Sequence, residues 1–126
     1  MKKKTMPDVC PCLLQDGVLF ADCCGRYIAG TALAPTAEAL MRSRYSAFVK
    51  DLRPYLQATW HPDTRPAEIE APEPGLQWLG LDVRDHRTLS ADRAEVEFVA
   101  RWRVAGRAVR LHERSRFERH ADEQGM

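Results

Sequence analysis

The sequence has no long apolar run, no strong net charge and no internal repeat. A helix that crosses a bilayer needs about 20 consecutive apolar residues, and no stretch of this chain approaches that length. The formal net charge is only +1 although 29% of the residues are charged, so no excess of one sign draws the chain toward nucleic acid or membrane. With 126 residues, we expect one soluble domain with a small appendage.

The N-terminus also lacks the pattern of a secretory signal. Lys2–Lys4 could open such a signal, but Thr5-Met6-Pro7-Asp8 follows where an apolar run is needed. We therefore expect a cytoplasmic protein. A reducing cytoplasm disfavours structural disulfides, so cysteines found together in such a protein favour a metal site.

Cysteine is confined to one short stretch near the N-terminus. All four cysteines lie within fifteen positions, as Cys10, Cys12, Cys23 and Cys24. Two close pairs can supply the thiolates that tetrahedral Zn²⁺ prefers, if the turn signal Asp16-Gly17 reverses the chain between them. Two disulfides are the alternative, but they need an oxidising compartment and a narrow geometry. We predict a structural zinc site with no open position for water.

We call the short segment around the four cysteines the knuckle, and its other residues suit a zinc site. Gly25 is expected to free the chain just after the second pair. The nearby cations of Lys2–Lys4 and Arg26 could offset the negative charge of four thiolates around Zn²⁺. The alternative for the lysine run is a solvated, frayed terminus.

A helix is predicted from Thr36, whose hydroxyl can cap the first free N–H groups. An apolar stripe with helical spacing predicts core packing along one face, made of Leu40, Met41, Tyr45, Phe48 and Leu52. Polar residues are expected on the other side: Arg42, Ser43, Ser46 and Lys50.

A second short helix is predicted over Tyr55–Trp60, with Pro54 in its first turn. His61 closes it, because a residue before proline is pushed out of the helical region. His61 could cap this helix, or it could line a pocket beside Trp60.

Alternating apolar residues then predict three strands, of which residues 94–104 form the clearest. Gly106-Arg107 fits a two-residue hairpin turn. In that register Glu113 points inward opposite Ala100, and a buried carboxylate needs a partner. Glu113 is expected either to form a structural pair with His61 or an arginine, or to bind a ligand.

The opposite face of the hairpin is basic. Its cationic side chains are Arg101, Arg103, Arg110, His112, Arg114 and Arg116. A solvated face is the default interpretation, and nucleic-acid binding is disfavoured because no aromatic residues interleave for base stacking.

Several motifs together resemble a known family. They are Cys10-Pro-Cys12, Cys23-Cys24-Gly25, Thr36-Ala-Glu-Ala-Leu-Met-Arg-Ser-Arg-Tyr-Ser-Ala-Phe-Val49, Thr59-Trp-His-Pro62, Val96-Glu-Phe-Val-Ala100 and His112-Glu-Arg-Ser-Arg-Phe117. In these motifs the chain resembles the YchJ-like family of uncharacterised bacterial proteins, over nearly its whole length.

The resemblance implies an α+β fold in two parts. Residues 1–30 would form a SEC-C zinc motif, with the four cysteines as ligands. Residues 31–126 would form an NTF2-like domain, a cone of helices on a curved antiparallel sheet. The family's final aromatic strand has no counterpart after Phe117. We therefore expect the last strand to be a sheet edge that could pair with a second copy of the chain.

Two functional hypotheses follow. The SEC-C motif is similar to the zinc tail of the SecA translocation ATPase, which docks a chaperone, so a protein partner is expected at the knuckle. The exposed apolar residues Leu13, Leu14, Val18 and Leu19 are available for that contact. The alternative is a small-molecule binder or enzyme that uses the cone, with Trp60, His61 and Glu113 as pocket residues and Glu113 as general base. We favour the first, an adaptor rather than an enzyme.

Overall fold

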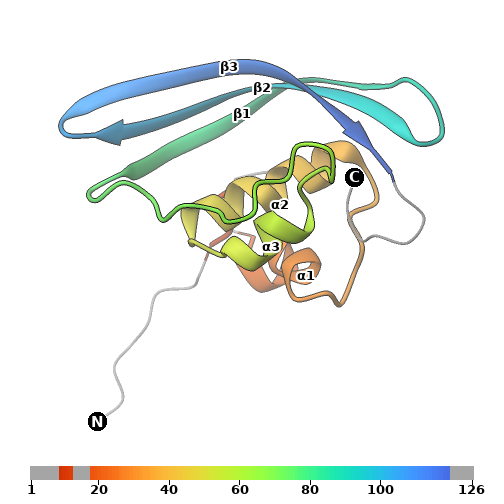
Figure 1. The fold of residues 1–126 in the computed structure, drawn as a ribbon, viewed down its shortest axis with the longest axis horizontal. Helices are drawn as coiled ribbons and strands as arrows, with labels where there is room; N and C mark the ends of the chain where they lie inside the picture. Colours follow the sequence, from red (N-terminus) through yellow and green to blue (C-terminus); the bar gives the residue numbers. More distant parts are fainter. Residues whose placement is uncertain (1–8, 13–17, 120–126) are drawn as a thin grey trace, which may run out of the picture.

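The computed structural model describes residues 9–12 and 18–119, and it places a layer of helices under a three-stranded sheet (Figure 1). The elements are η1 (Phe20–Asp22), α1 (Cys24–Ile28), α2 (Ala37–Val49), α3 (Arg53–Ala58), β1 (Gln77–Thr88), β2 (Arg93–Val104) and β3 (Arg107–Glu118). The strands are antiparallel in the order β1-β2-β3. The predicted α+β class is confirmed.

Helix α2 begins where its capping residue predicts. The Thr36 hydroxyl accepts a hydrogen bond from the Ala39 N–H at 3.0 Å, which satisfies one of the free donors of the first turn. One turn further, the Glu38 carboxylate pairs with Arg42 at 3.0 Å. The negative charge of Glu38 in the first turn also suits the helix dipole.

The apolar face of α2 packs on the sheet. Ala37 joins Ala94 and Val96 in one buried cluster, and the Tyr45 ring meets the edge of Trp78 with 5.5 Å between centroids. Burial of this stripe is the main driving force for docking the helix on the strands. The stripe predicted from the sequence therefore does form the contact with the core.

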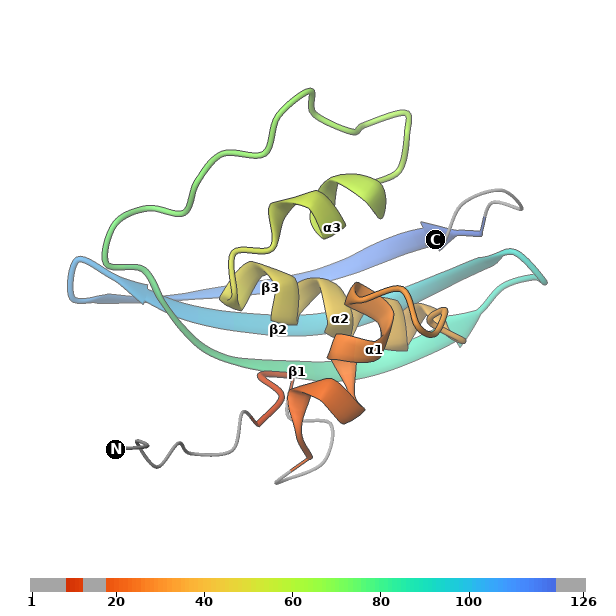
Figure 2. The same cartoon turned by 90° about the horizontal axis from the view of Figure 1, so that it is seen from below.

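Ser43 and Ser46 lie on the side of α2 opposite the sheet, as predicted, but that side does not face solvent. Both side chains are 0% exposed, because α2 is the middle layer of the molecule and not its outer layer. Figure 2 shows α1 and α3 on the side of α2 that faces away from the sheet. The Ser43 hydroxyl bonds the Tyr55 hydroxyl of α3 at 2.7 Å, and Ser46 faces the cysteine segment.

Helix α3 spans Arg53–Ala58, so it begins and ends two residues earlier than predicted. Pro54 lies in its first turn as expected. The Arg44 guanidinium connects α2 to the C-terminal end of α3. It donates to the Leu56 carbonyl at 3.2 Å and to the Thr59 hydroxyl at 2.6 Å. Burial lowers the pKa of Arg44 to about 10, which leaves it protonated at neutral pH.

The predicted hairpin register is wrong by two residues. The turn is made by Ala105 and Gly106, both with positive φ (52° and 76°), as a two-residue turn of the primed type requires. Phe98 therefore faces Glu113, and Ala100 faces Leu111. The sequence analysis placed glycine at the first central position, but here alanine takes that left-handed conformation.

Glu113 is not a buried carboxylate. It is exposed, and it accepts a hydrogen bond from the Ser115 hydroxyl at 2.6 Å. The helix layer packs against β1 and β2, so the inner face of β3 stays open where Glu113 lies. Within residues 9–12 and 18–119, β3 forms an edge of the sheet. Pairing of that edge with a second copy stays a prediction.

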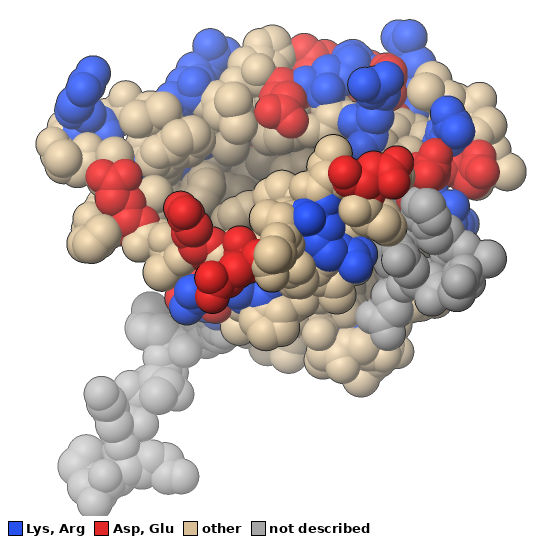
Figure 3. All heavy atoms as spheres, viewed as in Figure 1, with Lys and Arg blue, Asp and Glu red and all other residues tan. Residues whose placement is uncertain are grey.

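The outer face of the sheet carries a network of ion pairs. Arg114 bonds Asp85 at 2.9 Å, Glu97 at 3.0 Å and Glu95 at 3.2 Å, and His112 bonds Glu97 at 2.6 Å. The hydrogen bond from Arg114 holds the pKa of Asp85 below its usual range. Two of the predicted basic residues, Arg114 and His112, are therefore paired with carboxylates. Figure 3 shows acidic and basic side chains interspersed over the visible face.

None of the helices in the part of the chain that the structure describes is long and apolar enough to span a bilayer.

Candidate metal centre

Two short segments bring the cysteines together. The first carries Cys10 and Cys12, and it is held by a bridge between Val9 and Leu19 and by the Cys10 N–H, which donates to the Val18 carbonyl at 2.9 Å. The second is the start of α1, where Cys23 is the N-cap residue and Cys24 the first residue of the helix. The predicted Asp16-Gly17 turn lies outside the described residues.

The sulfur geometry fits a tetrahedral metal ion. The four Sγ atoms lie within 4.8 Å of one another, and the Cys10–Cys12 and Cys12–Cys23 sulfur distances are 3.6 and 3.7 Å. Four thiolates at about 2.3 Å from one ion place their sulfurs about 3.8 Å apart. A disulfide needs about 2.05 Å, and all four cysteines are free. The cluster can therefore hold a metal ion.

Burial makes a cation necessary if these sulfurs are ionised. None of the four residues is more than 8% exposed, and Val18, Phe20 and Ile28 pack around them. Several thiolates in an apolar setting are strongly unfavourable without a compensating positive charge. A bound divalent cation supplies that charge at the centre of the cluster.

The neighbouring sulfurs shift the pKa values of Cys10 and Cys24 in opposite directions. Hydrogen bonds from Cys12 and then Cys24 lower the pKa of Cys10, because the neighbouring S–H groups stabilise its thiolate. The hydrogen bonds to Cys10 and Cys12, together with burial, raise the pKa of Cys24, since a further thiolate beside the first is unfavourable. Metal binding therefore displaces protons, and protons and metal compete for these sulfurs.

Gly25 serves close packing rather than chain freedom. It is buried inside α1, and a Cβ atom there would lie 2.7 Å from the Phe20 carbonyl oxygen. That oxygen is fixed, because it accepts the Cys23 N–H at 3.0 Å. The absence of a side chain at Gly25 therefore lets η1 approach α1 and sets the position of Cys23.

Three polar residues of α2 and its C-cap contact the cysteine segments, and the sequence analysis placed all three on the side opposite the apolar stripe. The Arg42 guanidinium donates to the Cys12 carbonyl at 3.1 Å, and the Ser46 Oγ lies 3.5 Å from the Cys10 Sγ. The Lys50 ammonium lies over the Phe20 ring, 4.5 Å from its centroid. Their regular i, i+4, i+8 spacing indicates one polar side of the helix. That spacing does not distinguish a solvent-exposed side from one that packs against another polar segment.

The three predicted pocket residues do not form one site. The His61 Nε2 lies 3.1 Å from a Glu118 carboxylate oxygen, and its Nδ1 accepts the Asp63 N–H at 3.1 Å. Along an extended strand, Glu118 is roughly 16 Å from Glu113. Trp60 instead stacks under the Arg44 guanidinium, at 5.2 Å from the ring centroid.

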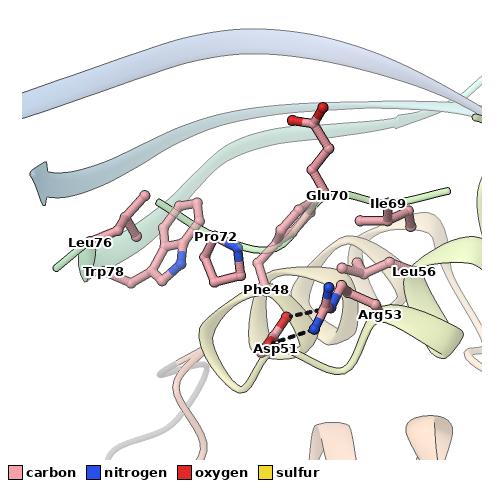
Figure 4. Close-up of a pocket in the computed structure, with 9 residues that line it drawn as sticks. All are labelled: Phe48, Asp51, Arg53, Leu56, Ile69, Glu70, Pro72, Leu76 and Trp78. Carbon is pink, nitrogen blue, oxygen red and sulfur yellow. Dashed lines mark hydrogen bonds and ion pairs between the residues drawn. The ribbon is translucent and has the colours of Figure 1, made fainter. Parts of the chain in front are cut away.

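An apolar pocket of about 200 Å³ lies elsewhere, between α2, α3 and the chain leading into β1. It is lined by Phe48, Asp51, Arg53, Leu56, Ile69, Glu70, Pro72, Leu76 and Trp78. Figure 4 shows the Asp51–Arg53 pair beneath Phe48 and Leu56, with Pro72, Leu76 and Trp78 to its left. The Arg53 Nε lies 3.0 Å from the Asp51 Oδ1, and Asp51 has a left-handed backbone conformation with φ 57°.

Comparison with known proteins agrees with this architecture. A family model described as the YchJ middle NTF2-like domain matches residues 36–124. A UPF0225 protein of Methylibium petroleiphilum is 63% identical over 117 residues, which is 92% of this chain and 83% of the relative. Another, from Polaromonas naphthalenivorans, is 63% identical over 103 residues, which is 82% of this chain and 75% of that protein.

Two solved structures share the fold, and both are of SEC-C motif containing proteins. The one from Rhodopseudomonas palustris superposes with a TM-score of 0.75 at 32% identity, covering 92% of this chain and 91% of the other. The one from Psychrobacter arcticus gives a TM-score of 0.72 at 30% identity, covering 91% and 75%. The chain therefore belongs to the UPF0225 family and carries the NTF2-like domain of YchJ behind a cysteine cluster able to hold a metal ion.

Proposed function

We propose that the protein is a zinc-stabilised interaction module, in which the metal shapes the N-terminal knuckle for contact with a protein partner. The observation that carries this is the tetrahedral spacing of four buried cysteine sulfurs. Sites with four thiolates and tetrahedral geometry select Zn²⁺ or iron–sulfur chemistry. Of these, a closed site in which four cysteines hold a single ion is typical of structural zinc.

The metal would have a structural role. All four coordination positions would be taken by Cys10, Cys12, Cys23 and Cys24, which leaves none for water or substrate. The energy of metal binding then stabilises a segment whose own apolar core is very small. With the metal bound, the knuckle would present a defined surface to a partner. Without the metal, the same segment would not hold one conformation.

Exposed apolar residues beside the metal ligands support a contact surface. Val9 and Leu19 face each other across the bridge and are 39% and 41% exposed. They form an apolar pair on the surface, next to the buried cysteines. Leu13 and Leu14, which the sequence analysis also assigned to this surface, lie outside the described residues.

Substituting Leu19→Asp should abolish capture of the partner while zinc stays bound. The charged side chain disrupts an apolar contact but touches no sulfur. The measurement is a quantitative pull-down from lysate of the protein's own organism, with wild type, Leu19→Asp, Cys23→Ser and Leu89→Asp as baits. Leu89 is the matched control, because it is 52% exposed in the turn between β1 and β2. Identical partner sets for wild type, Leu19→Asp and Cys23→Ser would contradict the proposal.

The apolar pocket favours a second candidate function, the binding of a small aromatic molecule. Its volume of about 200 Å³ exceeds the roughly 150 Å³ that holds a benzene ring in a dry cavity. The Phe48 and Trp78 rings, 5.9 Å apart, offer faces for stacking. The Asp51–Arg53 pair supplies polar groups that could orient such a ligand.

Titration with a single-ring compound such as phenol should shift the indole N–H resonance of Trp78 and leave that of Trp60 unchanged. Ile69→Phe should weaken this response, because the larger side chain fills part of the pocket, whereas Leu89→Phe should not. The measurement is a two-dimensional NMR titration at millimolar ligand. Equal shifts at Trp60 and Trp78, or none at either, would rule out the pocket as a binding site.

A further inference from the structure

The polar side of α2 meets the metal cluster at two points one helical turn apart. Ser46 is 0% exposed, and its Oγ lies 3.5 Å from the Cys10 Sγ. Arg42 donates to the Cys12 carbonyl at 3.1 Å while its Nε bonds Glu38 at 3.0 Å. Both contacts reach the first ligand segment, from residues at least thirty positions away in sequence.

The direction of the Ser46 hydrogen bond follows from the chemistry of the ligand. A thiol can either donate or accept, but a thiolate bound to a cation has no proton to give. In the metal-bound protein, the Ser46 hydroxyl must therefore be the donor and the Cys10 sulfur the acceptor. A buried hydroxyl also needs such a partner, since leaving it unsatisfied is costly.

We infer that Ser46 is a positioning residue of the metal centre: its hydroxyl donates to the Cys10 thiolate, and Arg42 fixes the same ligand segment through the Cys12 carbonyl. This inference rests on the proposed metal site. It assigns the outer shell of that site to α2, a helix of the NTF2-like domain. The metal is then coupled directly to the domain core, and the knuckle is not an independent appendage.

The hydrogen bond should strengthen metal binding in two ways. It draws negative charge from a cluster of four thiolates, and it orients the Cys10 sulfur. Outer-shell partners of metal ligands typically contribute about 10- to 100-fold in affinity. The positive charge of the Arg42 guanidinium near the cluster should also strengthen metal binding.

Ser43 offers a matched control on the same helix. It is also 0% exposed, but its hydroxyl bonds the Leu40 carbonyl and the Tyr55 hydroxyl, each at 2.7 Å. Ser43→Ala and Ser46→Ala thus remove the same atom from equally buried positions. Only Ser46→Ala removes a contact to a cysteine sulfur.

The test compares wild type, Ser46→Ala and Ser43→Ala after reconstitution with Co²⁺, together with Zn²⁺ affinity by competition with a chromogenic chelator. We expect Ser46→Ala to shift the thiolate-to-cobalt charge-transfer band and to weaken Zn²⁺ binding about 10- to 100-fold. Ser43→Ala should lower thermal stability and leave the band and the affinity unchanged. Arg42→Lys, a milder change at a partly exposed residue, should speed Zn²⁺ release to the chelator.

Equal spectra and affinities for Ser46→Ala and wild type would overturn the inference alone. If Ser46→Ala does not fold, an unchanged release rate in Arg42→Lys overturns it instead. Wild-type protein that binds neither Co²⁺ nor Zn²⁺ would overturn the metal centre itself, and the assignment of Ser46 with it.

Discussion

Replacing Cys12 with serine should remove the metal and cause a large loss of stability. Cys12 is 0% exposed, and its sulfur lies at 3.6 Å from that of Cys10 and 3.7 Å from that of Cys23. A serine hydroxyl is a poor ligand for Zn²⁺, so the remaining thiolates would lose the cation that compensates them. We expect a loss on the order of 4 kcal/mol in the free energy of unfolding.

The measurement is metal content per chain together with chemical denaturation. Ala29→Ser is the matched control, because it places the same side chain at the exposed C-cap of α1, away from the sulfurs. Chelator should bring the wild type to the stability of Cys12→Ser and leave Cys12→Ser itself unchanged. A Cys12→Ser protein with full metal content and wild-type stability would contradict the structural role of the site.

The second large effect is expected for Gly25→Ala. The added methyl group would lie 2.7 Å from the Phe20 carbonyl oxygen and 3.1 Å from two carbons of its ring. Because that oxygen accepts the Cys23 N–H, moving Phe20 to relieve the clash would also displace Cys23, one of the proposed metal ligands. We expect a loss of about 1–3 kcal/mol, the usual range for overpacking, and weaker Zn²⁺ binding.

Gly80→Ala separates this effect from the general consequences of adding a methyl group. A Cβ atom at Gly80 meets nothing within 4 Å, and its φ is not positive. Thermal melting and chelator competition should therefore leave Gly80→Ala near wild type. If Gly25→Ala were equally harmless, the close approach of η1 and α1 would not be what shapes the cluster.

Local patterns predicted much of this architecture. The Thr36 cap, the apolar stripe of α2 and the alternation along β2 each depend on residues near one another in sequence. The same holds for the four cysteines, whose spacing alone brings them to one point once the chain reverses. At these positions the chemistry of each residue and its short-range geometry were sufficient to predict the local structure.

Tertiary placement explains what the sequence did not predict. Ser43 and Ser46 look solvent-facing, because no pattern in α2 shows that α1 and α3 cover its polar side. Glu113 was expected on the inward face of β3, and the two-residue shift in register leaves it on that face, opposite Phe98 in place of Ala100. It is nevertheless exposed, because the helix layer packs against β1 and β2. The left-handed conformation of Ala105 accounts for the error in register, and the extent of the helix layer accounts for the exposure of Glu113.

The central claim is that one zinc ion bound by four cysteine sulfurs joins the N-terminal knuckle to the domain. X-ray absorption at the zinc edge, on reduced protein with its metal content measured in parallel, tests this most directly. The account predicts one zinc per chain with four sulfur neighbours at about 2.3 Å. Nitrogen or oxygen neighbours in the first shell, or well-folded protein with far less than one metal ion per chain, would contradict it.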